Sequence, residues 1–268
     1  MKTGMFDSGV GGISVLHSAC RMLDAPEYLY YADEAHAPYG KRDAKEVRAY
    51  ATDITRFLIE QGADAIVIAC NTATSAAVRQ LREMFDLPII GMEPAVKPAL
   101  LLAHPKGRER VLVLATPLTI AEEKLERLLL RFDKDHRTDL LALPGLVDFA
   151  EKGIFEGDGV DAYLEEALSG IDRDCYAAVV PGCTHFLFFL PQLQRHFPED
   201  CVFVDGNAGT VRHLAEVMHL RVREEKEAQA AKPKITYYVS GREVTKEEER
   251  QRFDALHARL DTIAALRE

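Results

Sequence analysis

Two cysteines stand in similar surroundings and could carry out acid–base chemistry together. Cys70 and Cys183 each follow a short apolar run and precede two polar residues, Asn71 with Thr72 and Thr184 with His185. A thiol, with a reference pKa of about 8.5, serves as a base when ionised and as an acid when protonated. Two thiols on opposite sides of one carbon atom could therefore remove a proton from one face and return a proton to the other.

The alternative to a chemical role is a structural one, in which the cysteine acts as a small buried hydrophobic residue. Three of the five cysteines fit this structural role. Cys20 continues an apolar helical stripe that includes Leu16. Cys175 and Cys201 stand at the beginnings of expected strands, away from the strand ends where ligands bind in open α/β sheets. The polar neighbours of Cys70 and Cys183 make these two the better candidates for reactive thiols.

Two further groups could assist the thiols. Asp7 and Ser8 open the glycine-rich turn at residues 7–12, where Asp7 could act on a thiol and Ser8 could contact a ligand. The turn matches neither the dinucleotide fingerprint nor a phosphate-binding P-loop, and a tight turn with Asp7 as a helix cap remains an equal alternative.

His185, two residues after Cys183, could stabilise a thiolate as an imidazolium, although an ordinary polar contact is the alternative. The spacing of Cys70, Cys183 and His185 does not match a zinc site, so we predict no metal.

The elements that would position these residues follow a strand–helix alternation. Residues 47–58 repeat apolar side chains at three- and four-residue intervals before Gly62, which predicts a helix covering a sheet. Such alternation is typical of parallel α/β folds. The predicted strands are Thr3–Phe6, Tyr28–Ala32, Ala65–Ala69, Pro88–Gly91, Val111–Ala115, Asp139–Leu143, Ala177–Val180 and Val202–Val204.

Two observations concern the organisation of the chain. The segments 66–72 and 179–185 resemble each other, which hints at an internal duplication. The segment Arg223–Lys234 lacks an apolar face and is interpreted as a solvated connection. An isolated β-like run, Ile235–Val239, and a charged final helix are expected to follow it.

Composition limits the class of protein. The chain has 268 residues, of which 47% are hydrophobic, and a net charge of −10. This balance, without clustered Lys and Arg, argues against a nucleic-acid partner, and an anionic substrate would need local dipoles to hold it. No apolar run could span a membrane. An odd number of cysteines without a CxxC pair indicates reduced thiols, so we expect a cytoplasmic protein.

Several motifs in order along the chain resemble those of the glutamate racemase family. The resemblance covers about the first 210 residues. The matching segments are Phe6–Gly12, Ala32-Asp33 with Pro38–Gly40, Ala69–Thr74, Glu93–Ala95 and Gly182–His185.

The resemblance implies a fold, an activity and a cellular role. The fold would be α/β, with two similar doubly wound domains whose mainly parallel sheets face each other across a cleft. Residues 1–95 plus 206–268 would form the first domain and residues 96–205 the second. The activity would be cofactor-independent interconversion of L- and D-glutamate, which supplies D-glutamate for peptidoglycan synthesis. A homodimer is common in the family.

Roles for individual residues are also implied by the resemblance. Cys70 would take the proton of the D-enantiomer with Asp7 as its helper, and Cys183 that of the L-enantiomer with His185. Glu151 matches a further acid of the family, although a helix-surface glutamate is the alternative. The implied substrate-binding residues are Ser8, Pro38, Tyr39, Gly40, Asn71, Thr72, Thr116, Thr119 and Thr184. Two segments depart from the family pattern, Phe186-Leu187 and Leu143–Gly145.

Three other functions remain open at this point. An aspartate or hydantoin racemase would use the same two thiols on the same fold. A Cys-His hydrolase would use Cys183 as a nucleophile and leave Cys70 without a role. A non-catalytic module for an acidic amino acid or a protein partner would bind without exchanging protons.

Overall fold

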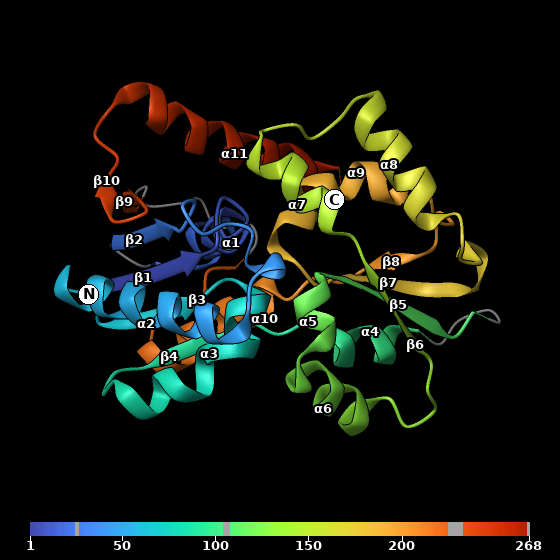
Figure 1. The fold of residues 1–268 in the computed structure, drawn as a ribbon, viewed down its shortest axis with the longest axis horizontal. Coiled ribbons are helices and arrows are strands. Elements are labelled where there is room, and N and C mark those ends of the chain that lie inside the picture. Colours follow the sequence, from blue (N-terminus) through green and yellow to red (C-terminus); the bar gives the residue numbers. More distant parts are fainter. Residues whose placement is uncertain (25–26, 104–107, 225–232, 267–268) are drawn as a thin grey trace.

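The computed structural model describes residues 1–24, 27–103, 108–224 and 233–266, and these form two α/β halves side by side (Figure 1). Each half is built around its own sheet. The predicted α/β fold with two mainly parallel sheets is confirmed.

The first sheet has six strands in the order β10-β9-β2-β1-β3-β4. All neighbouring strands run parallel except β9 and β10. The strands are β1 (Lys2–Asp7), β2 (Glu27–Ala32), β3 (Ala65–Ile68), β4 (Ile89–Gly91), β9 (Lys234–Val239) and β10 (Arg242–Glu243).

The second sheet has four parallel strands in the order β6-β5-β7-β8. They are β5 (Arg110–Ala115), β6 (Thr138–Ala142), β7 (Tyr176–Pro181) and β8 (Val202–Phe203). The strands of each sheet therefore all fall within one of the two predicted domains. The domain boundaries at residues 95 and 206 themselves stay a prediction.

The two sheets share a topology. The order β2-β1-β3-β4 in the first half has the same form as β6-β5-β7-β8 in the second. Strand β3, which leads to Cys70, corresponds to β7, which leads to Cys183. The likeness of the two strand ends thus reflects equivalent places in two similar halves.

Helices cover the sheets. The first half contains α1 (Ile13–Met22), α2 (Ala44–Glu60), α3 (Asn71–Met84), α10 (Asn207–Met218), α11 (Glu247–Ala265) and the short 3-10 helix η1 (Tyr39–Lys41). The segment between β4 and β5 carries α4 (Val96–Leu102). The second half contains α5 (Pro117–Ala121), α6 (Glu123–Phe132), α7 (Pro144–Glu151), α8 (Asp158–Leu168), α9 (Leu190–Gln194) and the 3-10 helices η2 (Arg173–Cys175) and η3 (Thr184–Phe189).

Helix α2 shows how local sequence sets an element. Asp43 caps its first turn and forms a reciprocal capping box with Glu46, which satisfies free backbone N–H groups. The helix ends at Glu60, and Gly62 follows with a positive φ of 88°. The predicted helix and its stop are both confirmed.

The prediction for the end of the chain is partly wrong. The run at Ile235–Val239 is not isolated, because β9 pairs in parallel with β2 over its whole length. Helix α11 carries charged residues but also buries four apolar ones: Phe253, Leu256, Leu260 and Ile263. Of the predicted solvated connection, residues 225–232 lie outside the described residues, and the side chain of Arg223 is only 5% exposed.

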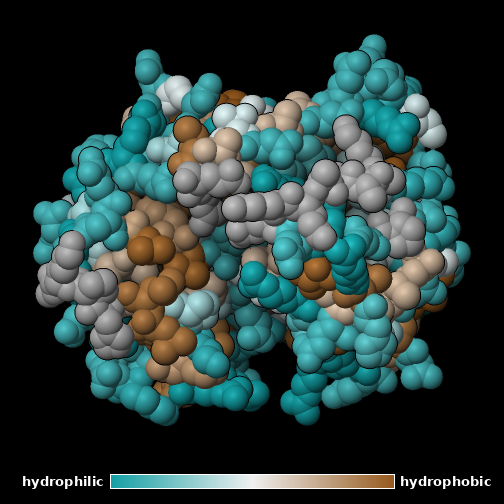
Figure 2. Space-filling model, turned by 180° about the vertical axis from the view of Figure 1, so that it is seen from behind, coloured by the Kyte–Doolittle hydropathy of each residue, from teal (hydrophilic) through white to brown (hydrophobic). Residues whose placement is uncertain are grey.

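The outer surface is largely hydrophilic. Seen from behind, the half that holds the second sheet carries a hydrophobic patch, and a notch separates the two halves at the lower edge (Figure 2). No helix within the described ranges is long and apolar enough to cross a membrane.

Candidate active site

The two candidate thiols lie just beyond equivalent strand ends. Cys70 follows β3 and Cys183 follows β7, and both residues are buried, with 5% and 7% of their surface exposed. Neither forms a disulfide. They are close enough for the charge of Cys183 to affect the pKa of Cys70. The structure therefore brings the two thiols into one buried site.

Cys70 is itself the N-cap of α3. Its Sγ accepts a hydrogen bond of 3.3 Å from the backbone N–H of Ala73, so the thiol itself caps this helix. Burial raises the pKa of the Cys70 thiol well above its usual value, and the nearby charge of Asp7 raises it further. Backbone N–H groups of Ala73 and Ser8 act in the opposite direction. Burial and the carboxylate of Asp7 therefore favour the protonated form of the Cys70 thiol.

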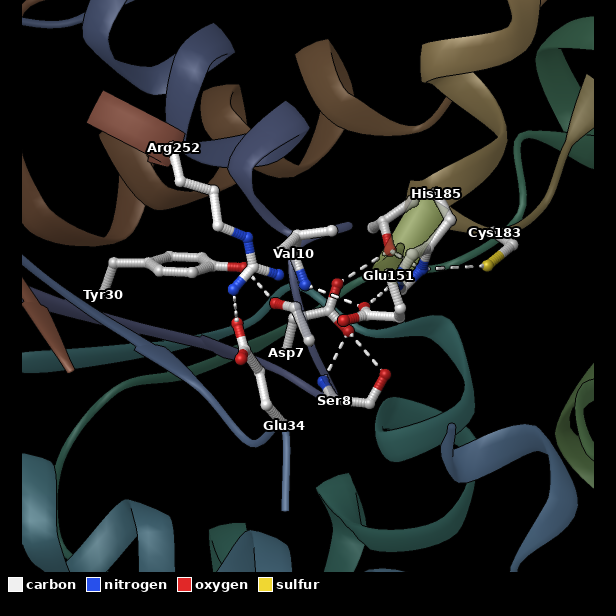
Figure 3. A network of polar contacts seen from close by, with 11 residues as sticks. Asp7, Ser8, Val10, Tyr30, Glu34, Glu151, Cys183, His185 and Arg252 are labelled. Atoms are coloured by element: carbon white, nitrogen blue, oxygen red, sulfur yellow. Dashed lines mark hydrogen bonds and ion pairs between the residues drawn. The ribbon is translucent and has the colours of Figure 1, made fainter. Parts of the chain in front are cut away.

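Cys183 lies against a histidine. Its Sγ is 3.6 Å from Nδ1 of His185, whose Nε2 lies 2.6 Å from Oε1 of Glu151 (Figure 3). Burial alone would lower the pKa of His185, but its hydrogen bonds with Cys183 and Glu151 and the charges of these groups raise the pKa well above its usual value. The raised pKa favours the imidazolium form of His185, whose ring stands directly beside the Cys183 sulfur.

Glu151 links the second half to the glycine-rich turn of the first. Its Oε1 accepts a hydrogen bond of 2.9 Å from the backbone N–H of Val10, as well as contacting His185. A side chain at Gly9 would fall 1.8 Å from this oxygen, so only glycine allows the approach. With 18% of its side chain exposed, Glu151 is not the helix-surface glutamate considered as the alternative.

Asp7 is fully buried at the end of β1. Its Oδ2 accepts a hydrogen bond of 2.7 Å from the hydroxyl of Thr184, and its Oδ1 accepts one of 3.1 Å from the hydroxyl of Ser8. Its carboxylate does not cap α1, whose first residue is preceded by Gly12 without a side-chain cap, so the helix-cap alternative is wrong. The carboxylate is placed between the halves, where it contacts groups from both.

Three threonine hydroxyls meet across the halves. Oγ1 of Thr72 lies 3.0 Å from Oγ1 of both Thr116 and Thr119, which are 2.9 Å apart. Beside them, Asn71 is 3% exposed, and neither polar atom of its amide has a hydrogen-bond partner among the described residues. A buried amide without partners costs free energy, so Asn71 has hydrogen-bonding groups to offer a polar ligand.

The segment Pro38–Gly40 lies against the same hydroxyls. A Cβ at Gly40 would come within 2.8 Å of the Cβ of Thr116. Tyr39 is buried, and its hydroxyl donates a hydrogen bond of 2.6 Å to Asp33. Asp33 is a positioning residue that sequence reasoning did not select, although it stands in one of the motif segments that carry the resemblance.

The arrangement suits proton transfer between two thiols. The structure brings together Cys70, Cys183, Asp7, His185 and Glu151, with hydroxyls from both halves around them. Within the described parts of the chain, no group of three or more His, Cys, Asp or Glu side chains is arranged to hold a metal ion.

Comparison with known proteins agrees with the motifs. Residues 7–214 match the Asp/Glu/hydantoin racemase family. A glutamate racemase of Halothermothrix orenii is 48% identical over 81% of this chain and 85% of its own length. One from Campylobacter concisus is 41% identical over 99% of this chain and all of its own length.

Structural comparison gives the same family. The structure of Escherichia coli glutamate racemase in complex with L-glutamate has a TM-score of 0.80 and 28% sequence identity, covering 96% of this chain and 94% of that one. The resemblance predicted from the motifs is confirmed, and the chain belongs to the Asp/Glu/hydantoin racemase family.

Proposed function

We propose that this protein is a glutamate racemase that transfers protons through Cys70 and Cys183. The observation that carries the proposal is the pair of buried thiols beyond equivalent strand ends, each beside its own charged helper. Asp7 acts on Cys70, and His185 with Glu151 acts on Cys183. The hydrolase alternative has no use for the second thiol or for its separate helper.

The reaction from L- to D-glutamate begins with Cys183 as a thiolate and Cys70 as a thiol. The thiolate takes the α-proton from one face, and the electron pair of the broken C–H bond spreads into the substrate carboxylate. The thiol of Cys70 then gives its proton to the opposite face. The protein ends with Cys183 protonated and Cys70 ionised, which is the starting state for D-glutamate.

The carbanion is the difficult intermediate, because this mechanism uses no electron sink beyond the substrate's own carboxylate. Hydrogen-bond donors fixed in a buried site stabilise developing charge more than water does. The amide of Asn71 and the hydroxyls of Ser8, Thr72 and Thr184 would surround the substrate carboxylates. The hydroxyls of Thr72, Thr116 and Thr119 would then separate and exchange their mutual hydrogen bonds for hydrogen bonds to the substrate.

Glutamate is favoured over aspartate by the relatives, since those at 41–48% identity are named glutamate racemases. D-glutamate would serve peptidoglycan synthesis. We place the reaction in the cytoplasm, because the five cysteines are free and the mechanism needs reduced thiols. We also expect a homodimer, which is common in the family.

A direct test follows optical rotation with purified protein that is free of metal and pyridoxal phosphate. We expect L- and D-glutamate to converge on the same racemic mixture, and L-aspartate to react more slowly than L-glutamate. Faster turnover of aspartate would assign the other substrate. Activity that required added pyridoxal phosphate would contradict the two-thiol mechanism.

A further inference from the structure

The thiol site is closed in this structure, so a substrate can enter only if the halves separate. Cys70 and Cys183 are almost fully buried. The polar groups around them bond to one another across the halves, as in the contacts of Thr184 with Asp7 and of Val10 with Glu151. Whatever holds the outer edge of this boundary together controls access to the thiols.

An open depression of about 510 Å³ marks where the site comes nearest to the surface. Pro38 and Glu151, both among the candidate site residues, line it, and Glu151 contacts His185. Lys41 and Asp148 also line it, from opposite halves of the protein. Lys41 ends η1, directly after Pro38–Gly40, and Asp148 lies one helical turn before Glu151 on α7.

These two residues form an ion pair across the boundary. Nζ of Lys41 lies 2.9 Å from both carboxylate oxygens of Asp148. The side chains are 53% and 41% exposed, which makes this contact more accessible than the buried cross-boundary bonds behind it. Glu34, which also lines the depression, forms an ion pair with Arg252, but both of these residues belong to the first half (Figure 3).

We propose that the Lys41–Asp148 ion pair is the latch of the substrate entrance. It ties η1, which carries the segment that packs on Thr116, to α7, which carries Glu151. Because exposed ion pairs are weak, this one can break and re-form on each catalytic cycle. Once it is open, Lys41 presents a free cation to an anionic amino acid that approaches a protein with a net charge of −10. The assignment of this entrance to glutamate rests on the proposed function.

The test measures access to the thiols and does not depend on racemisation. Native protein and the variants Lys41→Met and Asp148→Asn are treated with iodoacetamide, a neutral thiol reagent, and alkylation of each cysteine is followed by peptide mass spectrometry. Cys201, which is buried directly before β8, reports general loosening of the fold.

Two controls isolate the role of the latch. Asp161→Asn breaks a comparably exposed ion pair, that of Asp161 with Arg195, which lies within the second half. The double variant Lys41→Asp with Asp148→Lys reverses both charges and restores their attraction.

We expect alkylation of Cys70 and Cys183 to accelerate about two- to fivefold in each single variant, the change that the energy of an exposed ion pair allows. The rate at Cys201 stays unchanged, the Asp161 variant behaves as native, and the charge-reversed variant returns toward native. Unchanged rates at the two site thiols, or equal acceleration at all three cysteines, would overturn the latch. Failure of the proposed function would instead appear as native protein that does not racemise glutamate, whatever the alkylation rates.

Discussion

The hydroxyl of Thr184 donates a hydrogen bond of 2.7 Å to the buried carboxylate of Asp7 and so joins the two halves next to the thiols. Thr184 follows Cys183, while Asp7 ends the strand beside β3 and affects the pKa of Cys70. One contact therefore connects the surroundings of both proposed acid–base groups.

Removal of this hydroxyl should weaken catalysis without unfolding the protein. In Thr184→Val the charged carboxylate loses a hydrogen bond, and such bonds contribute about 1.5–3 kcal/mol. We expect kcat/KM to fall roughly ten- to a hundredfold, measured by optical rotation. Thr210→Val is the matched control, since Thr210 is also buried and its hydroxyl donates to the backbone of Gly206, one helical turn earlier. An equal loss in both variants would contradict a specific role for Thr184.

Each thiol should be needed for racemisation in both directions. Cys70→Ser and Cys183→Ser replace a thiol by a hydroxyl that is a far weaker acid, so we expect activity to fall at least about a hundredfold. Cys201→Ser, at another buried cysteine, should keep native activity. A Cys70→Ser variant with native activity would instead favour the hydrolase-like use of Cys183 alone.

Glu151 should set the protonation of His185. Its hydrogen bond and charge help to raise the pKa of His185 against the opposing effect of burial. In Glu151→Gln that support weakens, so the pKa of His185 falls and the imidazolium is lost at lower pH. NMR titration of the histidine, together with the pH dependence of kcat, tests this shift. An unmoved titration would show that Cys183 alone maintains the charge.

The contact between α11 and α1 within the first half should weaken in acid. Burial is the main cause that lowers the pKa of His257 to about 4, and the neighbouring His17 lowers it further. The native state thus binds fewer protons than the unfolded state, so this contribution to stability is complete above pH 6.5 and is lost as the pH falls toward 4.

Substitution at the same position tests that dependence. Between pH 6.5 and 4 the native protein should lose unfolding free energy, and in His257→Gln we expect this loss to be smaller by up to roughly 3 kcal/mol. Urea denaturation at each pH measures the difference. His213→Gln changes a largely exposed histidine and should leave the fall unchanged. The same pH dependence in the native protein and in His257→Gln would assign the acid sensitivity to other groups.

The sequence predicts the parts of this site that local patterns encode. Strand ends and polar neighbours identify Cys70 and Cys183, because both features lie within a few residues of the thiol. The contacts of Val10, Lys41 and Asp148 depend on how the two halves meet, which no local pattern records. The prediction of an isolated run at Ile235–Val239 fails for a similar reason, because its partner strand β2 lies about 200 residues earlier in the chain.

Heavy water provides the most direct measurement of the central claim. Native protein, free of metal and pyridoxal phosphate, is incubated with D-glutamate in heavy water while optical rotation and the α-proton NMR signal are followed together. Proton transfer through two thiols predicts that rotation decays to zero as deuterium replaces the α-proton, and that Cys70→Ser and Cys183→Ser each stop the decay. Folded protein that leaves both the rotation and the α-proton signal of D-glutamate unchanged would contradict it.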